Sequence, residues 1–456
     1  MSLDNLPVEW LSLQLKDIGN IFTGKTPSSK DATNFEGDIP FIKPGDLANG
    51  GYIFHTSTHI SPQALEALPN LPVNSIMVTC IGNMGKVGIN TKVSATNQQI
   101  NSIVPFKEFI NYKYTYYYCL TLKNWLERES SATTIAIVNK GRFSEAPIPL
   151  PPLAEQQEIV RQLDVMLAQV EQIKARLDAI PAILKKFRQS VLADAVSGKL
   201  TEADVSNWTE VTVNDLVNIV NGKSFPSSDY SAQGIKLLRP GNLHVSGKVK
   251  WTDKNTIYLP TVWKEKRSEL LLKEGALLMN LTAQSLADEF LGRVCILEKA
   301  DEDILLNQRI SSFESKLNYD VRSYLFYVFK SPQFRSYVDT LDTGTLIKHL
   351  NIKDIKTYKL KLPPESEQMQ IVTLLKSFIK SASRTEELVS LAKKRANLLT
   401  QAILAKAFSG ELTAEWREQH QDLITGVNSA ESLLAKIQAE REASKPVKKT
   451  RAKKNA

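Results

Sequence analysis

The chain has 456 residues, of which 42% are hydrophobic and 23% charged, a composition typical of globular proteins. At roughly 150 residues per domain, this length indicates about three folded units. No apolar run reaches the roughly 18 residues of a membrane span, and Met1 to Trp10 lacks the basic-then-apolar order of a signal peptide, so we expect a cytoplasmic protein. The cysteines, Cys80, Cys119 and Cys295, are scattered and odd in number, which argues against a disulfide framework or a thiolate metal site.

The net charge of +8 is concentrated near the end of the chain. From Arg441 onward, seven basic residues and one acid contribute +6, which leaves +2 for all preceding residues. This composition predicts a disordered basic tail over residues 441–456. Because the rest of the chain is nearly neutral, DNA binding would need basic residues gathered on one face, or a partner that neutralises further phosphates.

Residues 1–150 are predicted to form a mixed, strand-dominated domain. Short apolar runs separated by turn residues are typical of short strands joined by loops. Two segments look helical: Ser61–Leu68, with Ser61 as the N-cap and Pro62 at the first helical position, and the aromatic run Tyr112–Trp125. The predicted strands include Phe41-Ile42, Ile76-Met77-Val78 and Lys86-Val87-Gly88-Ile89.

A long amphipathic helix is predicted from Leu153. Between Val160 and Val191 apolar residues recur every three or four positions, which builds one apolar stripe with a coiled-coil-like seam. Pro181 lies inside this helix and should kink it, because proline removes a backbone donor and clashes with the preceding turn. Ser197-Gly198 provides the stop.

The segment Pro151–Thr201 recurs 212 positions later without insertion or deletion, which is a strong repeat signal. A second long helix is therefore predicted from about Glu367 to Phe408, with no proline inside it. Two similar amphipathic helices in one chain pair most simply with each other. The clearest repeated pairs are Pro151-Pro152 with Pro363-Pro364, Glu155-Gln156 with Glu367-Gln368, Ser197-Gly198 with Ser409-Gly410, and Leu200-Thr201 with Leu412-Thr413.

The first globular domain is repeated as well, with offsets that drift from 196 to 210. The two domains are thus expected to share a scaffold and to differ in the length and chemistry of their loops. The matching segments are Trp10 with Trp208, Gly24-Lys25 with Gly222-Lys223, Lys43-Pro44-Gly45-Asp46 with Arg239-Pro240-Gly241-Asn242, Gly85-Lys86-Val87 with Gly292-Arg293-Val294, and Asn97-Gln98-Gln99-Ile100 with Asn307-Gln308-Arg309-Ile310.

No catalytic or metal-binding motif is evident. There is no glycine-rich phosphate loop, and no Ser/His/Asp set follows from spacing. His55 and His59 have the spacing of a helical metal pair but lie in a segment that looks like loop or strand, which favours surface histidines. Pro226–Asp229 resembles the start of a nuclease motif but lacks the following acid and lysine. We predict no catalytic residue, no metal site and no cofactor site in this chain.

Basic and amide side chains at loop positions are the candidate DNA contacts. Arg, Lys, Asn and Gln pair with purine edges in the major groove, and Lys also suits phosphates. Taken singly, each is more simply explained as an ordinary exposed side chain. Asn97-Gln98 and Asn307-Gln308 are kept in both copies while their neighbours change, which favours a structural hydrogen-bonding role. The candidates are Lys25, Lys43, Asn83, Lys86, Lys140 and Arg142 in the first domain, and Lys223, Arg239, Arg293, Lys348 and His349 in the second.

A duplicated globular-then-helix unit, with Pro-Pro-x-x-Glu-Gln opening each helix and Ser-Gly-x-Leu-Thr closing it, resembles the specificity subunit of type I restriction-modification enzymes. The resemblance covers about residues 1–440. It implies a non-catalytic, DNA-binding subunit whose two target recognition domains each read one half of a split sequence, asymmetric here because the loops differ. It also implies that the helices form an antiparallel coiled coil that docks two modification subunits, which carry S-adenosylmethionine and methylate adenine. Restriction subunits with a motor and nuclease, using ATP and magnesium, would join them.

These inferences predict an α+β fold with pseudo-two-fold symmetry. The expected segments are a first target recognition domain over 1–150, a central helix and linker over 151–207, a second target recognition domain over 208–362, a C-terminal helix over 363–413, a short helical extension over 414–440 and the basic tail over 441–456.

Two other classes of protein compete with this interpretation. A self-sufficient methyltransferase or nuclease would need an Asn-Pro-Pro-Tyr or Asp-Pro-Pro-Tyr type motif or a cofactor-binding glycine loop, and neither occurs. A coiled-coil scaffold that binds only proteins remains open. It predicts that reversing the charges of Arg239 and Arg293 leaves DNA affinity intact.

Overall fold

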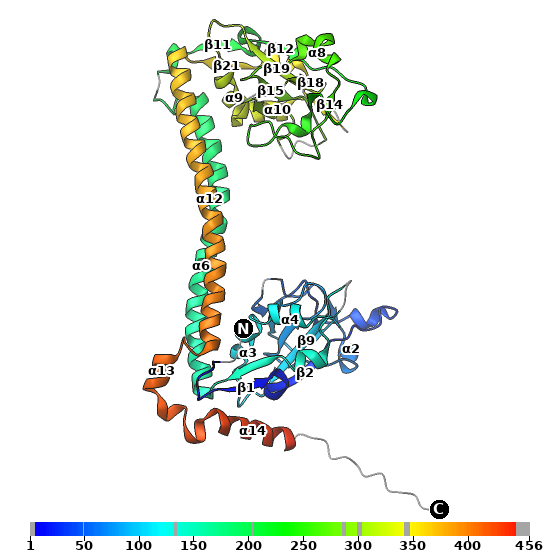
Figure 1. The fold of residues 1–456 in the computed structure, drawn as a ribbon, viewed down its shortest axis with the longest axis vertical. Helices are drawn as coiled ribbons and strands as arrows, with labels where there is room; N and C mark the ends of the chain where they lie inside the picture. The colour runs from blue at the N-terminus through cyan, green and yellow to red at the C-terminus, as the bar shows by residue number, and fades with distance from the viewer. Residues whose placement is uncertain are drawn as a thin grey trace, which may run out of the picture. The chain divides into compact units, whose positions relative to one another are not determined.

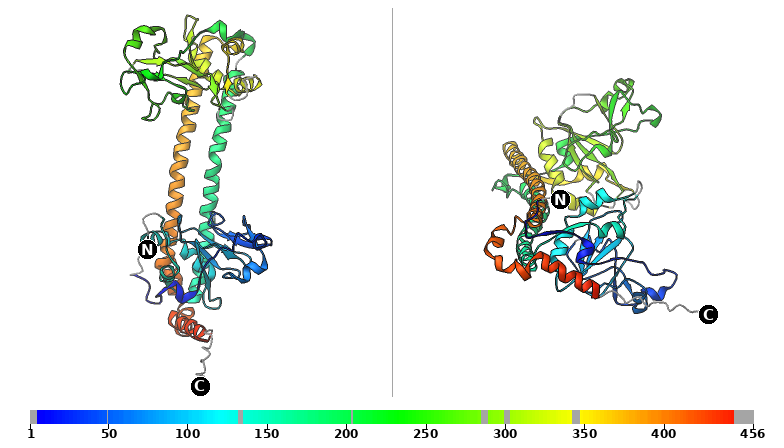
Figure 2. Two further views of the ribbon diagram at one scale, coloured as in Figure 1. Left: turned by 90° about the vertical axis from the view of Figure 1, so that its right-hand side faces the viewer. Right: turned by 60° about the horizontal axis from the view of Figure 1, so that its bottom comes forward.

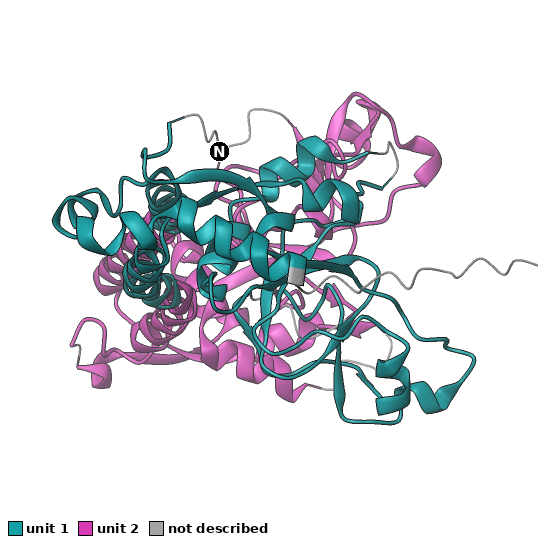
Figure 3. Cartoon of the chain, turned by 90° about the horizontal axis from the view of Figure 1, so that it is seen from below, with its two compact units in different colours: residues 1–177, 391–456 teal, residues 178–390 magenta. Residues whose placement is uncertain are grey.

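The chain divides into two compact units, residues 1–177 with 391–456 and residues 178–390 (Figure 3). Each unit contains one globular domain and one end of each of two long helices. No helix within the described part of the chain is long and apolar enough to cross a membrane. The computed structural model describes residues 5–48, 50–131, 135–202, 204–284, 289–298, 303–341 and 347–443.

The strands of the first globular domain are β1 (Leu11–Gln14), β2 (Gly19–Thr23), β3 (Ile39–Ile42), β4 (Tyr52–Ile53), β5 (His59–Ile60), β6 (Ile76–Thr79), β7 (Val87–Asn90), β8 (Ala95–Thr96), β9 (Ile100–Pro105) and β10 (Pro147–Leu150). They form a five-stranded sheet of order β2-β9-β6-β7-β4, a three-stranded sheet of order β5-β3-β8 and the ribbon β1-β10. Figure 1 labels β1, β2 and β9. The pairs β4–β7 and β3–β8 are parallel and the others antiparallel. The strands predicted around Phe41, Ile76 and Val87 are confirmed.

The central strand β6 is buried on both faces, which explains why its sequence is continuously apolar. Ile76 and Val78 belong to the main core of the first unit, while Met77 points into a second, smaller core. The helix predicted at residues 61–68 is α2 (Pro62–Glu66), whose first turn is capped by the Ser61 hydroxyl. The helix predicted over residues 112–125 is instead two helices, α3 (Tyr112–Cys119) and α4 (Lys123–Glu129).

The second globular domain repeats this topology. Its four-stranded sheet, of order β12-β19-β15-β17, corresponds to β2-β9-β6-β7, and its three-stranded sheet, β14-β13-β18, corresponds to β5-β3-β8 with the same parallel pair. Two ribbons, β11-β21 and β16-β20, complete it. The bounds are β11 (Thr209–Thr212), β12 (Val217–Asn221), β13 (Ile235–Leu238), β14 (Tyr258–Leu259), β15 (Leu277–Asn280), β16 (Thr282–Ala283), β17 (Val294–Ile296), β18 (Ile304–Leu306), β19 (Ile310–Ser315), β20 (Lys348–His349) and β21 (Lys359–Leu362).

Short helices cover the sheets of both domains. In the second domain, α9 (Arg322–Lys330) and α10 (Pro332–Thr340) bury a run of aromatic rings; the Phe329 ring lies 5.4 Å from that of Phe313 and 4.8 Å from that of Phe334. The remaining short helices are α1 (Leu15–Ile18), α5 (Lys140–Ser144), α7 (Val213–Leu216), α8 (Val262–Lys266) and α11 (Ile352–Thr357). The 3-10 turns of the two domains are η1 (Ala32–Phe35), η2 (Val205–Asn207), η3 (Ser227–Asp229), η4 (Pro240–Asn242) and η5 (Ser268–Leu270).

The two predicted long helices are α6 (Leu153–Val196) and α12 (Glu365–Ser409). Each is followed by a glycine in the left-handed region, Gly198 at φ +81° and Gly410 at φ +83°, which confirms the predicted stops. Pro181 lies inside α6 without ending it. The kink expected at this proline stays a prediction.

The helices pair in both units, and in each unit their ends lie side by side (Figure 2). In the first unit Lys174 Nζ donates to Thr400 Oγ1 at 3.2 Å. In the second unit the Arg188 guanidinium bonds both carboxylate oxygens of Glu386, at 2.6 and 2.9 Å. In both units the start of one helix contacts residues just beyond the end of the other, so the predicted antiparallel pairing is confirmed.

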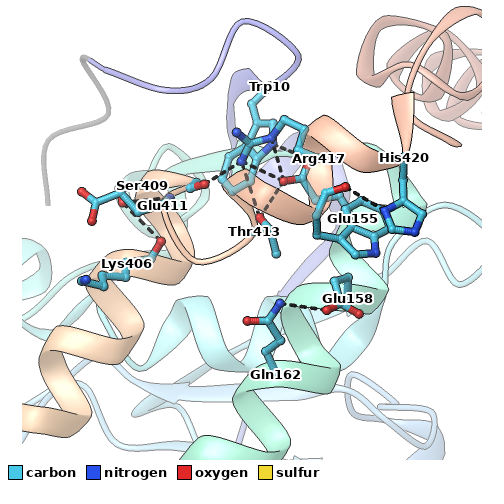
Figure 4. Close-up of polar contacts among 12 residues, drawn as sticks. Trp10, Glu155, Glu158, Gln162, Lys406, Ser409, Glu411, Thr413, Arg417 and His420 are labelled. Carbon is cyan, nitrogen blue, oxygen red and sulfur yellow. Dashed lines mark hydrogen bonds and ion pairs between the residues drawn. The ribbon is translucent and has the colours of Figure 1, made fainter. Parts of the chain in front are cut away.

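The repeated Glu-Gln pair fastens each helix start to its globular domain. In the first unit the fully buried Glu155 carboxylate accepts hydrogen bonds from Trp10 Nε1 (2.8 Å), Thr413 Oγ1 (2.7 Å) and Arg417 Nε (2.9 Å), as Figure 4 shows. The neighbouring Gln156 side chain accepts from the Asn111 N–H and donates to a backbone carbonyl oxygen. These bonds satisfy a carboxylate that would otherwise be costly to bury.

We call this set of contacts between the helix start, its globular domain and the residues beyond the end of the other helix a joint. The second unit has the same joint, built from the repeat-equivalent residues. The Glu367 carboxylate accepts from Trp208 Nε1 at 3.1 Å and from Thr201 Oγ1 at 2.8 Å. The Gln368 amide donates to the Pro363 carbonyl oxygen at 2.8 Å. Each joint therefore takes its tryptophan and glutamate from one repeat and its threonine from the other.

The segment after α12 packs on the first unit. It contains α13 (Ala414–Gln419), η6 (Gln421–Leu423), η7 (Gly426–Asn428) and α14 (Ala430–Ala443), of which Figure 1 labels α13 and α14. Leu433 and Ile437 of α14 join the core of that unit. Helices α13 and α14 thus lie in the segment predicted as a short helical extension, and α14 runs to residue 443, so residues 441–443 are helical where the sequence predicted a disordered tail. Arg441, on the last turn of α14, lies 3.4 Å from Asp17. The remainder of the predicted basic tail, 444–456, lies outside the described residues.

Candidate nucleic-acid interface

Two repeated sequence motifs meet at one edge of the first globular domain. A Cβ on Gly24 would stand 2.1 Å from the Asn97 carbonyl oxygen, so only glycine permits this approach. The Lys25 N–H donates to the Thr96 carbonyl oxygen at 2.9 Å, and the Asn97 N–H donates to that of Ile42 at 3.2 Å. The exposed Lys25 side chain therefore lies where β2, β3 and β8 end.

Lys43 and Lys86 lie at a turn beside this edge. The Lys43 ammonium donates to Thr58 Oγ1 at 2.8 Å, and its backbone N–H donates to the Asp46 carboxylate, also at 2.8 Å. The Lys86 ammonium donates to the Pro44 carbonyl oxygen at 3.4 Å. The structure thus brings together two of the predicted lysines, which come from segments about forty residues apart in the sequence.

The second domain repeats the first of these arrangements. A Cβ on Gly222 would stand 1.9 Å from the Asn307 carbonyl oxygen, and the Gln308 N–H donates to the Lys223 carbonyl oxygen at 2.8 Å. The exposed Lys223 ammonium is 3.3 Å from the Glu269 carboxylate. The repeated Gly-Lys and Asn-Gln motifs therefore pack on each other in both domains.

Arg239 and Arg293 take the places of Lys43 and Lys86. Arg239 is exposed, with its guanidinium carbon 5.9 Å from the centre of the Tyr230 ring. Arg293 is half-buried; its Nη1 donates to the Leu243 carbonyl oxygen at 3.3 Å and its guanidinium carbon lies 4.7 Å from the Phe290 ring centre. Each domain thus gathers three predicted cations at one edge.

The other predicted residues of the first domain have separate surroundings. Asn83 is exposed in the loop after β6. Lys140 and Arg142 lie on α5, where the Lys140 ammonium is 6.0 Å from the Phe22 ring centre. Arg142 forms ion pairs with two carboxylates, those of Glu129 and Glu145, which raise the pKa of its guanidinium and balance its charge. A phosphate would have to compete with these acids for Arg142.

Lys348 and His349 form β20, which pairs with β16 so that Thr282 faces His349 and Ala283 faces Lys348. The ribbon stands next to a cavity of about 820 Å³. This cavity is lined by His244, Thr282, Phe290, Arg293, Arg309 and Ile347, among others. Burial and the charges of Lys250 and Arg293 lower the pKa of His244, which favours its neutral, hydrogen-bonding form.

Arg309, His244, Lys330 and Arg335 near this cavity were not among the predicted residues. Arg309 had a usable signal, because it replaces Gln99 within an otherwise repeated motif. The structural role predicted for Asn97 is confirmed, since its side chain exchanges hydrogen bonds with Gln99 at 2.9 and 3.2 Å.

The chemistry of the buried thiols is that of core residues. Burial raises the pKa of Cys80 and of Cys295 to about 12, so both stay protonated at neutral pH. Within the ranges that the structure describes, no three His, Cys, Asp or Glu side chains gather in a way that could hold a metal ion.

Comparison with known proteins places these features in a family. The model of the type I restriction modification DNA specificity domain matches residues 7–182 and 205–391. The EcoKI specificity subunit of Escherichia coli K12 is 32% identical over 99% of this chain and 100% of that relative, and the EcoBI specificity subunit of Escherichia coli is 30% identical over 97% and 95%.

Solved structures show the same fold at lower sequence identity. One chain, from a study of the complex assembly and conformational transition of the type I R-M system, has a TM-score of 0.68 at 17% identity and covers 89% of this chain and 99% of its own length. The HsdS subunit from Thermoanaerobacter tengcongensis has a TM-score of 0.57 at 16% identity, with 89% and 98% covered.

Proposed function

Because the chain belongs to the family of type I restriction-modification DNA specificity subunits, we propose that its two globular domains read the two halves of a bipartite, asymmetric DNA sequence. One observation carries the proposal: the domains present cations at three equivalent positions of one scaffold, and at two of the three a lysine in the first domain is an arginine in the second. Arginine pairs bidentately with guanine, whereas lysine is a point charge. The equivalent positions are Lys25 and Lys223, Lys43 and Arg239, and Lys86 and Arg293.

The long helices carry exposed apolar side chains that support docking of two copies of one partner. Met166 and Leu399 in the first unit are 37% and 47% exposed. At the repeat-equivalent positions of the second unit, Phe378 and Phe187 are 36% and 39% exposed. The Phe187 and Phe378 rings contact each other, with centroids 6.1 Å apart, but all four side chains keep more than a third of their surface exposed on the two units, which favours partner binding. We propose that the partner is the methyltransferase subunit, and that restriction subunits join the assembly.

The low net charge of the chain agrees with DNA binding that is shared between this chain and its partner subunits. Residues before Arg441 carry a net charge of only +2, so much of the phosphate neutralisation would come from the partners. We propose that S-adenosylmethionine belongs to the methyltransferase subunit and ATP with magnesium to the restriction subunit, while this chain supplies recognition. The chain purified alone should then not methylate DNA, and robust methylation by it would overturn this division of labour.

Mapping methylated adenines in a genome that carries this chain and its partners tests the recognition proposal. We expect a two-part sequence with unlike halves. Arg239→Glu, at an exposed position, should weaken DNA binding and relax only one half, while Lys264→Glu, on α8 of the same domain, serves as a charge-matched control. If Arg239→Glu left both the DNA affinity and the recognised sequence unchanged, the result would favour a scaffold that binds only proteins. Exchanging residues 1–150 for those of a relative should change the other half alone.

Native mass spectrometry of the co-expressed complex tests the docking proposal. Phe187→Glu with Phe378→Glu should remove one methyltransferase copy, and Met166→Glu with Leu399→Glu the other. Val262→Glu, an equally exposed apolar position on the second globular domain, is the control and should leave both copies bound. Retention of two copies by both double variants would contradict docking on these helix faces.

A further inference from the structure

A second, small cavity of the second globular domain is lined by cations. It has a volume of about 40 Å³ and shares Val245 and Arg293 with the wall of the large cavity. Lys330 and Arg335 complete its polar lining together with Glu289. At ~10–15 Å³ per water, such a space admits about three waters, which is enough for the two non-bridging oxygens of one phosphate group.

Arg335 enters this cavity from α10 with half of its guanidinium unsatisfied. Its Nη1 donates to the carbonyl oxygens of Leu291 at 2.9 Å and Glu289 at 3.4 Å. Its Nε and Nη2 are buried, and neither has a hydrogen-bond partner among the residues that the structure describes. Buried donors of a charged group are rarely left unpaired, because they lose their hydrogen bonds to water and gain none in the protein. An anionic oxygen in the cavity would satisfy them.

Lys330 adds a second cation at the end of α9. Its ammonium lies 5.0 Å from the centre of the Phe326 ring, and no carboxylate in the described part of the chain forms an ion pair with it or with Arg335. Burial lowers the pKa of both groups, while the nearby Glu289 acts in the opposite direction. The cavity thus holds two largely buried charges, which an anion would compensate better than the single acid on its wall.

The first globular domain has a related arrangement. Gly292 precedes Arg293 at φ +68°, and a Cβ there would stand 2.6 Å from Arg335 Nη2. Gly85 precedes Lys86 in the same way at φ +82°, and a Cβ there would stand 2.9 Å from the Cβ of Lys123. In both domains a residue from the second helix after the sheet packs against the left-handed glycine turn, Arg335 with its guanidinium and Lys123 with its apolar stem.

We propose that the small cavity is a seat for one backbone phosphate of the bound DNA, held by the Lys330 ammonium and the free guanidinium nitrogens of Arg335. This inference rests on the proposed DNA recognition and adds a register-fixing contact to it. Phosphate contacts position a protein on the duplex, whereas base edges supply the sequence information. A phosphate held here would set the strand at a fixed place against the side chains of the adjoining large cavity.

Lys330→Met tests the seat, with the full-length chain bound to its methyltransferase partner and DNA carrying the mapped sequence. Methionine keeps the apolar stem on Phe326 and removes the charge. We expect about tenfold weaker binding and a salt dependence reduced by about one phosphate contact. Folding stability should be kept or increased, because a buried charge is removed. A purely structural Lys330 predicts the reverse: lower stability and an unchanged salt dependence.

Replacing single phosphates of the DNA by neutral methylphosphonates identifies the contact. One position should weaken binding of the wild-type protein by about tenfold but leave Lys330→Met unaffected. Lys359→Met, which removes an exposed lysine paired with Glu210, is the control and should keep the wild-type profile. If Lys330→Met kept the wild-type DNA affinity and the wild-type dependence on methylphosphonate position, the proposed phosphate seat would be wrong. If the wild-type protein shows no preference for the mapped sequence, the proposed recognition function fails instead.

Discussion

The buried joint at Glu155 offers the most stringent test of how the chain is held together. In the first unit, Arg417 reaches back from α13 to a fully buried carboxylate, and its own side chain is only 11% exposed. Replacing Arg417 by Met would keep much of the packing against the Trp10 ring, which lies 5.5 Å from the guanidinium carbon, and remove the charge. Glu155 would then be a buried anion with two neutral donors.

The expected effect follows from this geometry. Breaking a buried ion pair by removing one partner costs about 3–5 kcal/mol. Because Trp10 and Thr413 still donate to Glu155, we expect the lower end, about 3 kcal/mol. The joint of the second unit is a natural comparison: Glu367 is half-buried and has two neutral donors, so Glu367→Gln should cost only about 1 kcal/mol.

Hydrogen exchange measured by mass spectrometry reports this local stability. A loss of about 3 kcal/mol corresponds to roughly 150-fold less protection of amides in α13 and α14, since 1.4 kcal/mol is a factor of ten. The double variant Glu155→Gln with Arg417→Met should recover most of the protection, because neither buried charge remains.

Two results would refute this reasoning. Wild-type exchange of α13 and α14 in Arg417→Met would mean that the ion pair does not hold this segment. The second result concerns the double variant. If its loss of stability equalled the sum of the losses in the two single variants, the two charges would not be coupled.

Two further predictions concern the second globular domain. Gly222→Ala should destabilise it by about 2 kcal/mol or more in chemical denaturation, because a Cβ would collide with the Asn307 carbonyl oxygen, whereas Gly241→Ala, with no atom within 4 Å of the new carbon, should be nearly neutral. The stability gained by Lys330→Met should be full at neutral pH and vanish as the pH rises toward 10.5, because burial lowers the folded-state pKa and the unfolded chain binds more protons in between. A gain that is independent of pH would contradict the buried-charge explanation.

The helices were predictable because their signals are local. The spacing of apolar residues, the Ser-Gly stop and the fixed offset of 212 together give α6 and α12 within two residues of the observed bounds. The break between α3 and α4 was missed because the aromatic run Tyr112–Trp125 has no glycine or proline to mark it. The end of α3 is therefore set by tertiary packing and not by a local stop signal.

The joints could not be predicted from the repeat. Glu155 and Thr201 lie in one copy and Glu367 and Thr413 in the other, and a repeated sequence cannot say whether such residues meet within a copy or between copies. The structure shows that they meet between copies. Trp10 and Glu155 are likewise 145 residues apart, beyond the reach of any local pattern.

The candidate interface was predictable only in part. Lys25, Lys43 and Lys86 were recognisable because their counterparts stand in repeated loop motifs. Lys330 and Arg335 sit on helices among aromatic residues, where a single cation reads as an ordinary surface charge. Their burial depends on how α9 and α10 pack, which sequence periodicity alone does not encode.

In each joint the threonine of one repeat bonds to the glutamate of the other, and this gives a physical reason for the constant register of the repeat. In each copy 46 positions separate the glutamate at the helix start from the threonine beyond the helix end, Glu155 from Thr201 and Glu367 from Thr413. One inserted residue would rotate everything beyond it by about 100° and shift it by about 1.5 Å, which would carry the threonine away from its glutamate. Because each helix begins at one joint and ends at the other, an insertion in either helix disturbs the fit of both. Loops of the globular domains carry no such constraint, so their lengths differ while the helical segments keep one spacing.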